Sequence, residues 1–252
     1  MLVLLPPSET KRPDGDPVPL DLSRLRLPSL GQLREQAVAA LVALSQDEDE
    51  AVRVLKLSVR QRGEVEVNRV LREAPTMPAV DRYTGVLYDA LSAGSLDGSA
   101  RGWLAAHALI QTAPFGPVGA ADPLPAYRLS AGGRLPGLPP LRRHWSEATT
   151  AALRDAAAGG LVVDLRSKSY VELGPVPDDV PGVYVHVVAE EDGAVRALNH
   201  FNKKAKGLLV RRMAETGVQA RSVDELLAWA RAAGVTLRAG AHPREAVLVA
   251  AA

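Results

Sequence analysis

The 252-residue sequence contains no cysteine, so disulfides, thiolate-ligated zinc and iron–sulfur clusters are excluded. A Walker loop, a GxGxxG following a strand and a GxSxG elbow are also missing. The histidines are scattered without the spacing of metal ligands, at positions His107, His144, His186, His200 and His242. The sequence therefore predicts no metal site and no bound cofactor.

Long hydrophobic runs are missing as well. The start, MLVLLPPSETK, has a short apolar run without the basic segment of a signal peptide, and no uncharged apolar run approaches membrane-spanning length. We expect a soluble, cytoplasmic protein without a membrane partner. The net charge of +1 excludes a globally basic nucleic-acid coat, so any anion binding must come from local clustering.

Lysine is scarce, since only six of the 30 basic residues are lysines. Three of them, Lys203, Lys204 and Lys206, fall within NHFNKKAKGLLVRR, and Lys11 and Lys168 lie in two other polar motifs. Arginine is the usual cation of this chain. Lysine differs from arginine in being a compact point charge whose pKa can be lowered, which suggests that these lysines serve a chemical purpose.

Hydrophobic patterning predicts a mixed α/β protein, with a central mixed sheet surrounded by helices. No repeat and no clear linker divides the chain, so we expect one domain over 1–252. Buried strands are expected at 2–5, 107–111, 161–165, 183–188 and 246–249. Helices are expected at 30–44, 64–73, 96–105, 146–158, 203–215 and 222–233, with another beginning near Thr84.

The longest irregular stretch is 112–144, whose prolines and glycines are expected to prevent regular structure. It contains Tyr127, Arg128 and Arg134. Tyrosine can stack on a base, while arginine can pair with a phosphate. Alternatively, Tyr127 simply anchors the loop on the core.

A helical projection of 203–215 separates two faces. Ala205, Leu208, Leu209 and Met213 are expected to pack inward. The opposite arc carries a further set of residues, namely Lys203, Lys204, Gly207 and Arg211. A glycine within a basic arc would allow a phosphate to approach closely, so the pattern favours an anion site over an ordinary solvated face.

Two polar motifs follow predicted strands. Ser8 and Lys11 come after 2–5, and Lys168 and Tyr170 come after 161–165. Strand ends that converge on one side of a sheet form a cleft. A lysine beside hydroxyls can hold a phosphate or act as a nucleophile when its pKa is lowered. The structural alternatives are a capped turn for Lys11 and half-buried packing for Tyr170.

Five stretches together resemble the peroxide-stress YaaA family: MLVLLPPSETK, RYTGVLYDAL, YRLSAGGRL, LVVDLRSKSYVEL and FNKKAKGLLVRRMAE. They occur in the family's order and span essentially the whole chain. The resemblance implies a cytoplasmic protein that protects against hydrogen peroxide by limiting free iron. It also implies a DNA-binding α+β fold with a positively charged cleft and a helix–hairpin–helix element.

The sequence departs from that pattern at 59–71, VRQRGEVEVNRVL, which is the best local candidate for the hairpin. Charged residues flank Gly63, where a helix–hairpin–helix turn requires apolar ones. Direct iron sequestration is disfavoured, because no cluster of carboxylates and histidines is present.

Two hypotheses follow. In the first, the chain binds DNA or another phosphate-bearing ligand through Lys203, Lys204, Lys206, Arg211, Arg128, Arg134, Lys168 and Tyr170. In the second, it is an enzyme acting on a nucleobase, nucleoside or nucleotide-like small molecule. The catalytic candidates would then be Lys11, Ser8, Tyr127 and Lys204. An arginine at position 204 would preserve the first function and impair the second.

Overall fold

The computed structural model of the chain describes residues 1–191, 194–196 and 199–250. Its longer helices are α1 (Gly31–Leu44), α2 (Glu48–Leu55), α6 (Gly98–His107), α7 (Leu141–Ala157), α9 (Asn199–Thr216) and α10 (Val223–Ala232). Its shorter helices are α3 (Glu64–Arg69), α4 (Ala79–Arg82), α5 (Val86–Leu91) and α8 (Lys168–Val171).

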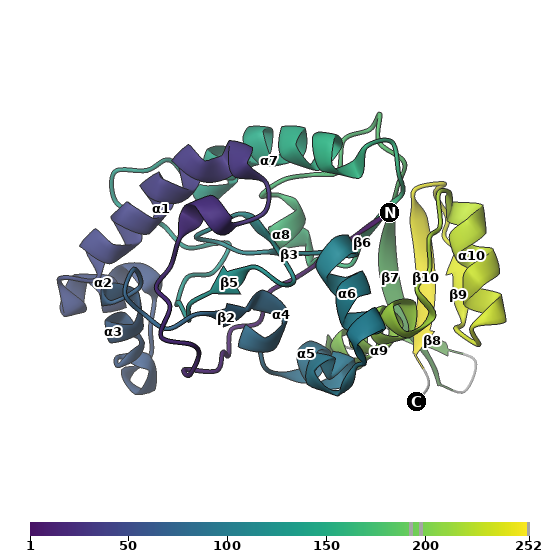
Figure 1. Cartoon of the computed structure of the whole chain (residues 1–252), viewed down its shortest axis with the longest axis horizontal. Helices are drawn as coiled ribbons and strands as arrows, with labels where there is room; N and C mark the ends of the chain where they lie inside the picture. Colours follow the sequence, from purple (N-terminus) through teal and green to yellow (C-terminus); the bar gives the residue numbers. More distant parts are fainter. Residues whose placement is uncertain (192–193, 197–198, 251–252) are drawn as a thin grey trace.

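One mixed sheet organises the chain, with strand order β4-β3-β1-β6-β7-β10-β9 and β8 paired with β7 (Figure 1). Neighbouring strands from β3 to β10 run parallel, while β4, β8 and β9 pair antiparallel to theirs. The strands are β1 (Leu2–Leu5), β3 (Ala108–Gln111), β4 (Pro117–Gly119), β6 (Val162–Asp164), β7 (Gly182–Glu191), β8 (Ala194–Arg196), β9 (Leu237–Ala239) and β10 (Glu245–Ala250). The mixed α/β fold predicted from the sequence is confirmed.

The first strand, β1, is central because it is apolar on both faces. All four of its residues are buried, as expected of a parallel strand that is covered on both sides. β1 lies between β3 and β6, so the chain passes to one side of β1 and later returns to the other. In parallel sheets, ligand-binding loops commonly lie at such a reversal, which here falls at the carboxyl ends of β1 and β6.

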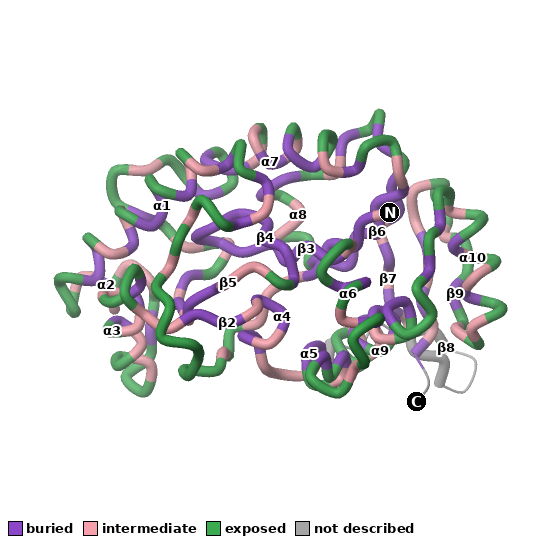
Figure 2. Tube along the Cα trace, viewed as in Figure 1, coloured by how far each residue is buried: buried purple, intermediate pink, exposed green. Residues whose placement is uncertain are grey.

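Helices cover the sheet, and the buried side chains concentrate along its strands (Figure 2). Helix α9 packs against α5, α6, β7 and β10. Alternate residues of β7, such as Val183 and Val185, are buried, whereas Tyr184 and His186 on the other face are only half-buried. Figure 1 shows α1 and α7 along the opposite side of the molecule from α5 and α9.

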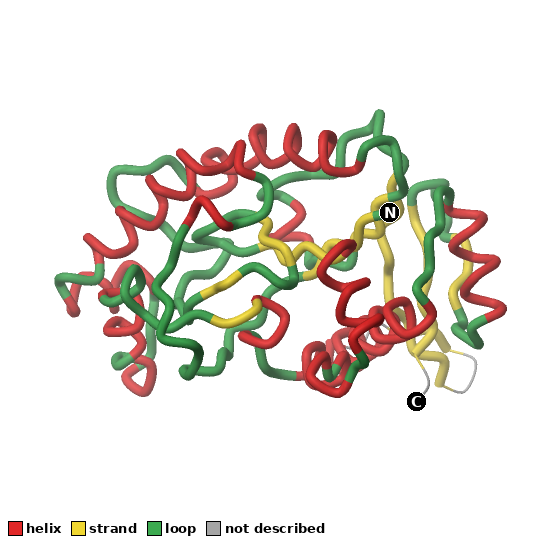
Figure 3. The backbone as a smooth tube through the Cα atoms, viewed as in Figure 1, coloured by secondary structure: helices red, strands yellow, loops and turns green. Residues whose placement is uncertain are grey.

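Long loops fill the region between the helices α1 and α7 and a second, two-stranded sheet (Figure 3). This small sheet pairs β2 (Met77–Pro78) with β5 (Pro123–Leu124). The prediction that 112–144 lacks regular structure is wrong in part, because the stretch contains β4 and β5. Both strands are only two or three residues long, which the proline and glycine content permits at a sheet edge.

Two fully buried arginines tie these loops together. Arg34 of α1 donates to the backbone carbonyls of Phe115 at 2.9 Å and Pro117 at 2.8 Å, and also to carbonyls of 25–27. Arg82 donates to the carbonyl of Leu124 at 2.9 Å and to carbonyls of 12, 14 and 75. Because buried carbonyls require donors, each guanidinium satisfies several loop segments at once.

Two helix starts compare differently with their predictions. The helix expected at 222–233 begins at Val223, and Ser222 caps it (α10) by accepting a hydrogen bond from the Glu225 amide at 3.2 Å. The helix expected at 146–158 begins earlier, since α7 starts at Leu141, directly after Pro140. Among the described residues, the helices lack the combination of length and hydropathy that crossing a lipid bilayer requires.

Candidate functional site

Two of the predicted polar motifs lie at the same edge of the sheet. β1 and β6 are adjacent parallel strands, so the segments that follow them, 6–11 and 165–170, leave the sheet side by side. This is the edge at which the strand order reverses. The convergence of strand ends predicted from the sequence therefore holds for Lys11 and Tyr170.

Lys11 is the best-defined group at this edge. Its ammonium donates to the carbonyls of Ser8 at 3.0 Å and Glu9 at 3.2 Å. It also lies 4.1 Å from the ring centroid of Tyr127 and 5.5 Å from that of Tyr83. The contact with Tyr127 is a cation–π interaction, which contributes about 0.5–2 kcal/mol depending on desolvation. No carboxylate lies within ion-pair distance of Lys11 in the described structure.

These surroundings change the acidity of Lys11. Burial, assisted by the positive charge of Arg128, lowers the pKa of Lys11 to about 7, although Glu64 and Glu9 act in the opposite direction. A lysine with this pKa is partly neutral near pH 7, whereas an ordinary lysine is fully protonated. The neutral amine can accept a proton or attack an electrophile, so Lys11 is chemically the most reactive of the predicted residues.

A group of buried aromatic residues supports Lys11. The hydroxyls of Tyr83 and Tyr127 are 2.8 Å apart, and the ring of Tyr127 also meets that of Phe115 edge to face. Burial raises the pKa of both tyrosines well above its ordinary value, so both remain neutral phenols. Tyr127 is 3% exposed and one face of its ring carries Lys11. It anchors its loop, and stacking on a base would require displacement of Lys11.

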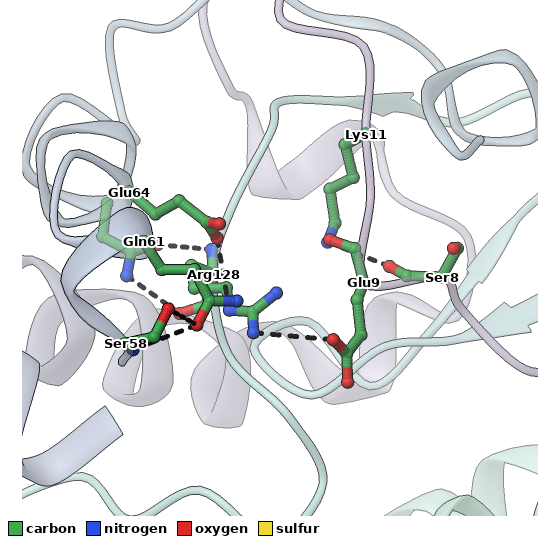
Figure 4. A network of polar contacts seen from close by, with 8 residues as sticks. Ser8, Glu9, Lys11, Ser58, Gln61, Glu64 and Arg128 are labelled. Atoms are coloured by element: carbon green, nitrogen blue, oxygen red, sulfur yellow. Dashed lines mark hydrogen bonds and ion pairs between the residues drawn. The ribbon is translucent and has the colours of Figure 1, made fainter. Parts of the chain in front are cut away.

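Arg128 is paired inside the protein. Its guanidinium lies between the carboxylates of Glu64 at 3.2 Å and Glu9 at 3.6 Å (Figure 4). The side chain of Asn68 holds its backbone, accepting from the Arg128 amide at 2.7 Å and donating to its carbonyl at 2.9 Å. With two carboxylates beside it, Arg128 offers a phosphate little uncompensated charge.

Ser8 lies close to Gly85, a position where a larger residue would be crowded. Its hydroxyl is 3.4 Å from that of Thr10, and the two line the approach to Gly85. Gly85 has a φ of +96°, and a Cβ there would lie 3.2 Å from the Ser8 hydroxyl. Gly85 therefore allows the turn before α5 to pass close to the loop after β1.

Lys168 and Tyr170, the other predicted pair, lie on different sides of the short helix α8. Tyr170 faces the Lys11 neighbourhood, since Glu9 and Arg128 influence its charge, and burial raises the pKa of Tyr170 to about 12. Lys168 is exposed and lines a cavity of about 480 Å³. The two residues that the sequence grouped together thus serve different surroundings.

Helix α9 differs from the predicted arrangement. Gly207 is buried against α5, where a Cβ would lie 2.2 Å from the carbonyl oxygen of Leu87. The expectation that Gly207 opens the basic arc to a ligand is therefore wrong. Leu208, expected to pack inward, is 48% exposed instead. The buried face of α9 contains Leu209, Val210 and Met213.

That buried face also carries Lys206, which is 6% exposed. Its ammonium lies 5.8 Å from the ring centroid of Tyr184. Burial lowers the pKa of Lys206 to about 8, against the attraction of Asp164. Asp164 itself forms a buried ion pair with Arg166 at 2.6 Å.

The remaining predicted cations lie elsewhere. Lys203 and Lys204 are exposed on α9, whereas Arg211 pairs with Glu215 at 2.8 Å and donates to Ser95 at 2.8 Å. Arg134 lies in a groove of about 450 Å³ that Arg53 and Lys56 also line. The predicted anion-binding residues are thus distributed over several surroundings.

Some of these features were not singled out from the sequence. Tyr83 and Tyr88 in RYTGVLYDAL contact the Lys11 loop, where the Tyr88 hydroxyl donates to the Pro6 carbonyl at 2.8 Å. The two tyrosines of that motif could have indicated from the sequence that it contributes to the site. The buried pair of Asp164 and Arg166 also appears in the sequence, as DLR directly after a buried strand. Clusters of three or more potential metal ligands were not found among the described residues.

The fold and this edge define a mixed α/β protein with a half-buried lysine in the loop after its central strand. Residues 1–239 match the model of the family described as Peroxide stress protein YaaA, and the chain belongs to this family. A UPF0246 protein of Corynebacterium efficiens is 45% identical over 241 residues, covering 94% of both chains. UPF0246 proteins of Corynebacterium glutamicum and Streptomyces coelicolor are 43% and 40% identical, covering 97% and 96% of this chain and 98% and 93% of theirs.

Proposed function

We propose that the protein is an enzyme acting on a nucleobase, nucleoside or nucleotide-like small molecule at the Lys11 edge. The observation that carries this proposal is the half-buried amine of Lys11, which lies against the rings of Tyr127 and Tyr83 in the loop after β1 and whose pKa is lowered to about 7. In this proposal the neutral amine acts as a base or a nucleophile. The backbone carbonyls of Ser8 and Glu9 hold the amine (Figure 4), and the rings of Tyr83 and Tyr127 lie beside it.

The distribution of charge favours a small ligand over a duplex at this edge. Arg128 and Arg211 both have carboxylate partners, which reduces what they can offer to phosphates. A single desolvated amine among aromatic rings is typical of a chemical site, whereas duplex binding relies on several free cations along a surface. The family description supports a role for this enzyme in peroxide stress, and we expect that role in the cytoplasm.

The test uses free nucleobases and nucleosides as probes, with binding followed by ligand-detected NMR and turnover by chromatography. We expect the unmodified chain to bind and turn over one of these compounds. The Lys11→Met variant should turn it over at least 100-fold more slowly. Lys11→Arg should fail similarly, because arginine stays protonated. Lys203→Met, which alters an exposed lysine, is the matched control. Equal turnover in Lys11→Met and the unmodified chain would contradict the proposal.

Nucleic-acid binding is the second candidate. The observation favouring it is that Lys203 and Lys204 are exposed and lack carboxylate partners within the described part of the chain. The hairpin offers less support, because 59–61 forms a short 3-10 helix and Arg62 pairs with Glu48 and Asp49. If α9 binds DNA, affinity should fall steeply with salt, and Lys203→Gln with Lys204→Gln should reduce that slope. Lys204→Arg should preserve binding, whereas a catalytic Lys204 would not tolerate it.

A further inference from the structure

A cavity of about 480 Å³ lies on the side of α8 away from Lys11. Tyr170 of α8 faces the Lys11 neighbourhood, while Lys168, Val171 and Glu172 line the cavity. Its volume is within the range of small-molecule sites, roughly 300–1,000 Å³. α8 is therefore a partition between the Lys11 edge and a second space.

The floor of this cavity is a row of side chains across three adjacent strands. Asp164 of β6, Tyr184 of β7 and Glu245 of β10 are register partners, so they project from the same face of the sheet. His186 follows two residues after Tyr184 on that face, and the two ring centroids are 4.9 Å apart. The two rings meet edge to face at 70°, so a planar ligand ring can pack on the face of one and against the edge of the other.

Two of the three carboxylates of the lining pair with arginines, Asp164 with Arg166 at 2.6 Å and Glu172 with Arg142 at 3.9 Å. The third, Glu245, lies 3.4 Å from the Nε2 of His186, which is a cation only when it is protonated.

Two cations of the lining lack such a partner within the described residues. Lys168 is exposed at the mouth of the cavity and forms no ion pair there. Arg244 donates to the backbone carbonyls of Pro177, Asp178 and Val180, and these bonds leave its positive charge uncompensated. The lining therefore has a surplus of positive charge.

From this we propose that the cavity binds a small planar anion, namely an aromatic ring that bears a phosphate or carboxylate. The ring packs on Tyr184 and His186, and Lys168 pairs with the anionic group. This site is separate from the one at Lys11, and neither proposal depends on the other.

Titration calorimetry of the full chain with adenosine monophosphate, adenosine and inorganic phosphate tests the proposal. The monophosphate should bind at least tenfold more tightly than either adenosine or phosphate, because only it engages both the rings and the cation. Lys168→Ala should reduce its affinity to that of adenosine. Lys168 is exposed, so this variant should fold normally.

A second pair of variants tests the aromatic floor. Tyr184→Phe keeps the ring and should preserve binding, whereas Tyr184→Leu should weaken adenosine and its monophosphate alike by about tenfold. A thermal melt establishes that both variants are folded. Equal affinity of the monophosphate and inorganic phosphate for the unmodified chain would overturn the proposed role of the rings.

Controls separate this site from the one at Lys11. Lys56→Ala removes an exposed lysine at the end of α2 and should leave the affinity unchanged. If Lys11→Met abolishes binding of the monophosphate while Lys168→Ala does not, the ligand occupies the Lys11 edge and the cavity proposal is wrong.

Discussion

Two lysine-bearing regions of the molecule, the loop after β1 and helix α9, present lysine in different ways. Lys11 lies in a short loop, where two carbonyls accept its protons and two aromatic rings surround it. On α9, the side chains of Lys203 and Lys204 are solvated, whereas Lys206 points into the protein. A dense run of charge thus contains both surface and interior residues, and an isolated lysine has the most perturbed environment.

The difference teaches that burial, rather than the density of charge, determines how reactive these amines are. Burial is the main cause that lowers the pKa of both Lys11 and Lys206. The neighbouring residues Lys203 and Lys204 do not share that environment. Four variants test this contrast, in order of decreasing effect.

The largest effect is expected from Asp164, which pairs with the buried Arg166 and attracts Lys206. Asp164→Ala leaves a buried guanidinium without its partner, so the free energy of unfolding should fall by about 3–5 kcal/mol. Asp179→Ala breaks the exposed pair with Arg154 and should cost less than about 1 kcal/mol. Urea denaturation measures both. Equal losses of unfolding free energy in the two variants would mean that the buried ion pair stabilises the fold no more than the exposed one.

Gly207 should be next, because it fixes the contact between α9 and α5. Gly207→Ala places a Cβ against the Leu87 carbonyl and should lower the free energy of unfolding by about 1–3 kcal/mol. The matched control is Gly102→Ala in α6, where no atom lies within 4 Å of the added Cβ. That change should instead stabilise by about 0.5–1 kcal/mol. If both substitutions stabilise the protein, α9 and α5 can move apart at low cost to make room for the added methyl group.

Lys11 should produce a pH-dependent effect. Folded Lys11 loses its proton near pH 7, whereas a lysine in the unfolded chain keeps it to about pH 10.4. Between these values the unfolded state binds more protons, so the free energy of unfolding rises with pH, by at most about 1.4 kcal/mol per unit. Lys11→Met should remove this rise between pH 7 and 8. Above pH 8, Lys206 contributes a rise of its own.

The measurement is the free energy of unfolding in urea at pH 7, 7.5 and 8. Lys204→Met is the control, and it should retain the dependence of the unmodified chain. If Lys11→Met keeps the same slope, Lys11 has an ordinary pKa and the contrast with α9 disappears.

The smallest effect is expected on the outer face of α9. Replacing Lys203 and Lys204 together by glutamine should change the free energy of unfolding by less than about 0.5 kcal/mol, since both are exposed and without ion pairs. Thermal denaturation at matched salt measures this change. A larger loss would mean that these lysines contribute to the fold.

The central strands could be predicted because each is a short apolar run. β1 is predicted at 2–5 and observed at Leu2–Leu5, while β6 and β10 differ from their predictions by one residue at each end. The short strands β4 and β5 were missed because tertiary pairing, rather than local sequence, forms them. The start of α7 was misplaced because Ser146 resembles a cap, although Pro140 already permits a helix to begin.

The position of a candidate site residue could be predicted only where it follows directly from the direction of a parallel strand. Parallel strands bring Lys11 and Tyr170 to one edge, which the order of strands and loops implies. The buried position of Lys206 could not be predicted from a helical projection, because the neighbour that buries it, β7, lies elsewhere in the sequence. Gly207 was interpreted as an opening, but whether a glycine faces ligand or protein depends on the packing of α5.

Arg34 has a consequence for how the chain folds. Its guanidinium joins α1 to 25–27, nearby in sequence, and to Phe115 and Pro117, which are 81 and 83 residues away. A partly assembled state that buries Arg34 before the distant segment arrives would leave its Nε–H with neither water nor the Phe115 carbonyl to accept a hydrogen bond. Closure of these segments should therefore be concerted, and the long separation in sequence should make that step slow. The arginine sets the order of assembly as well as its end state.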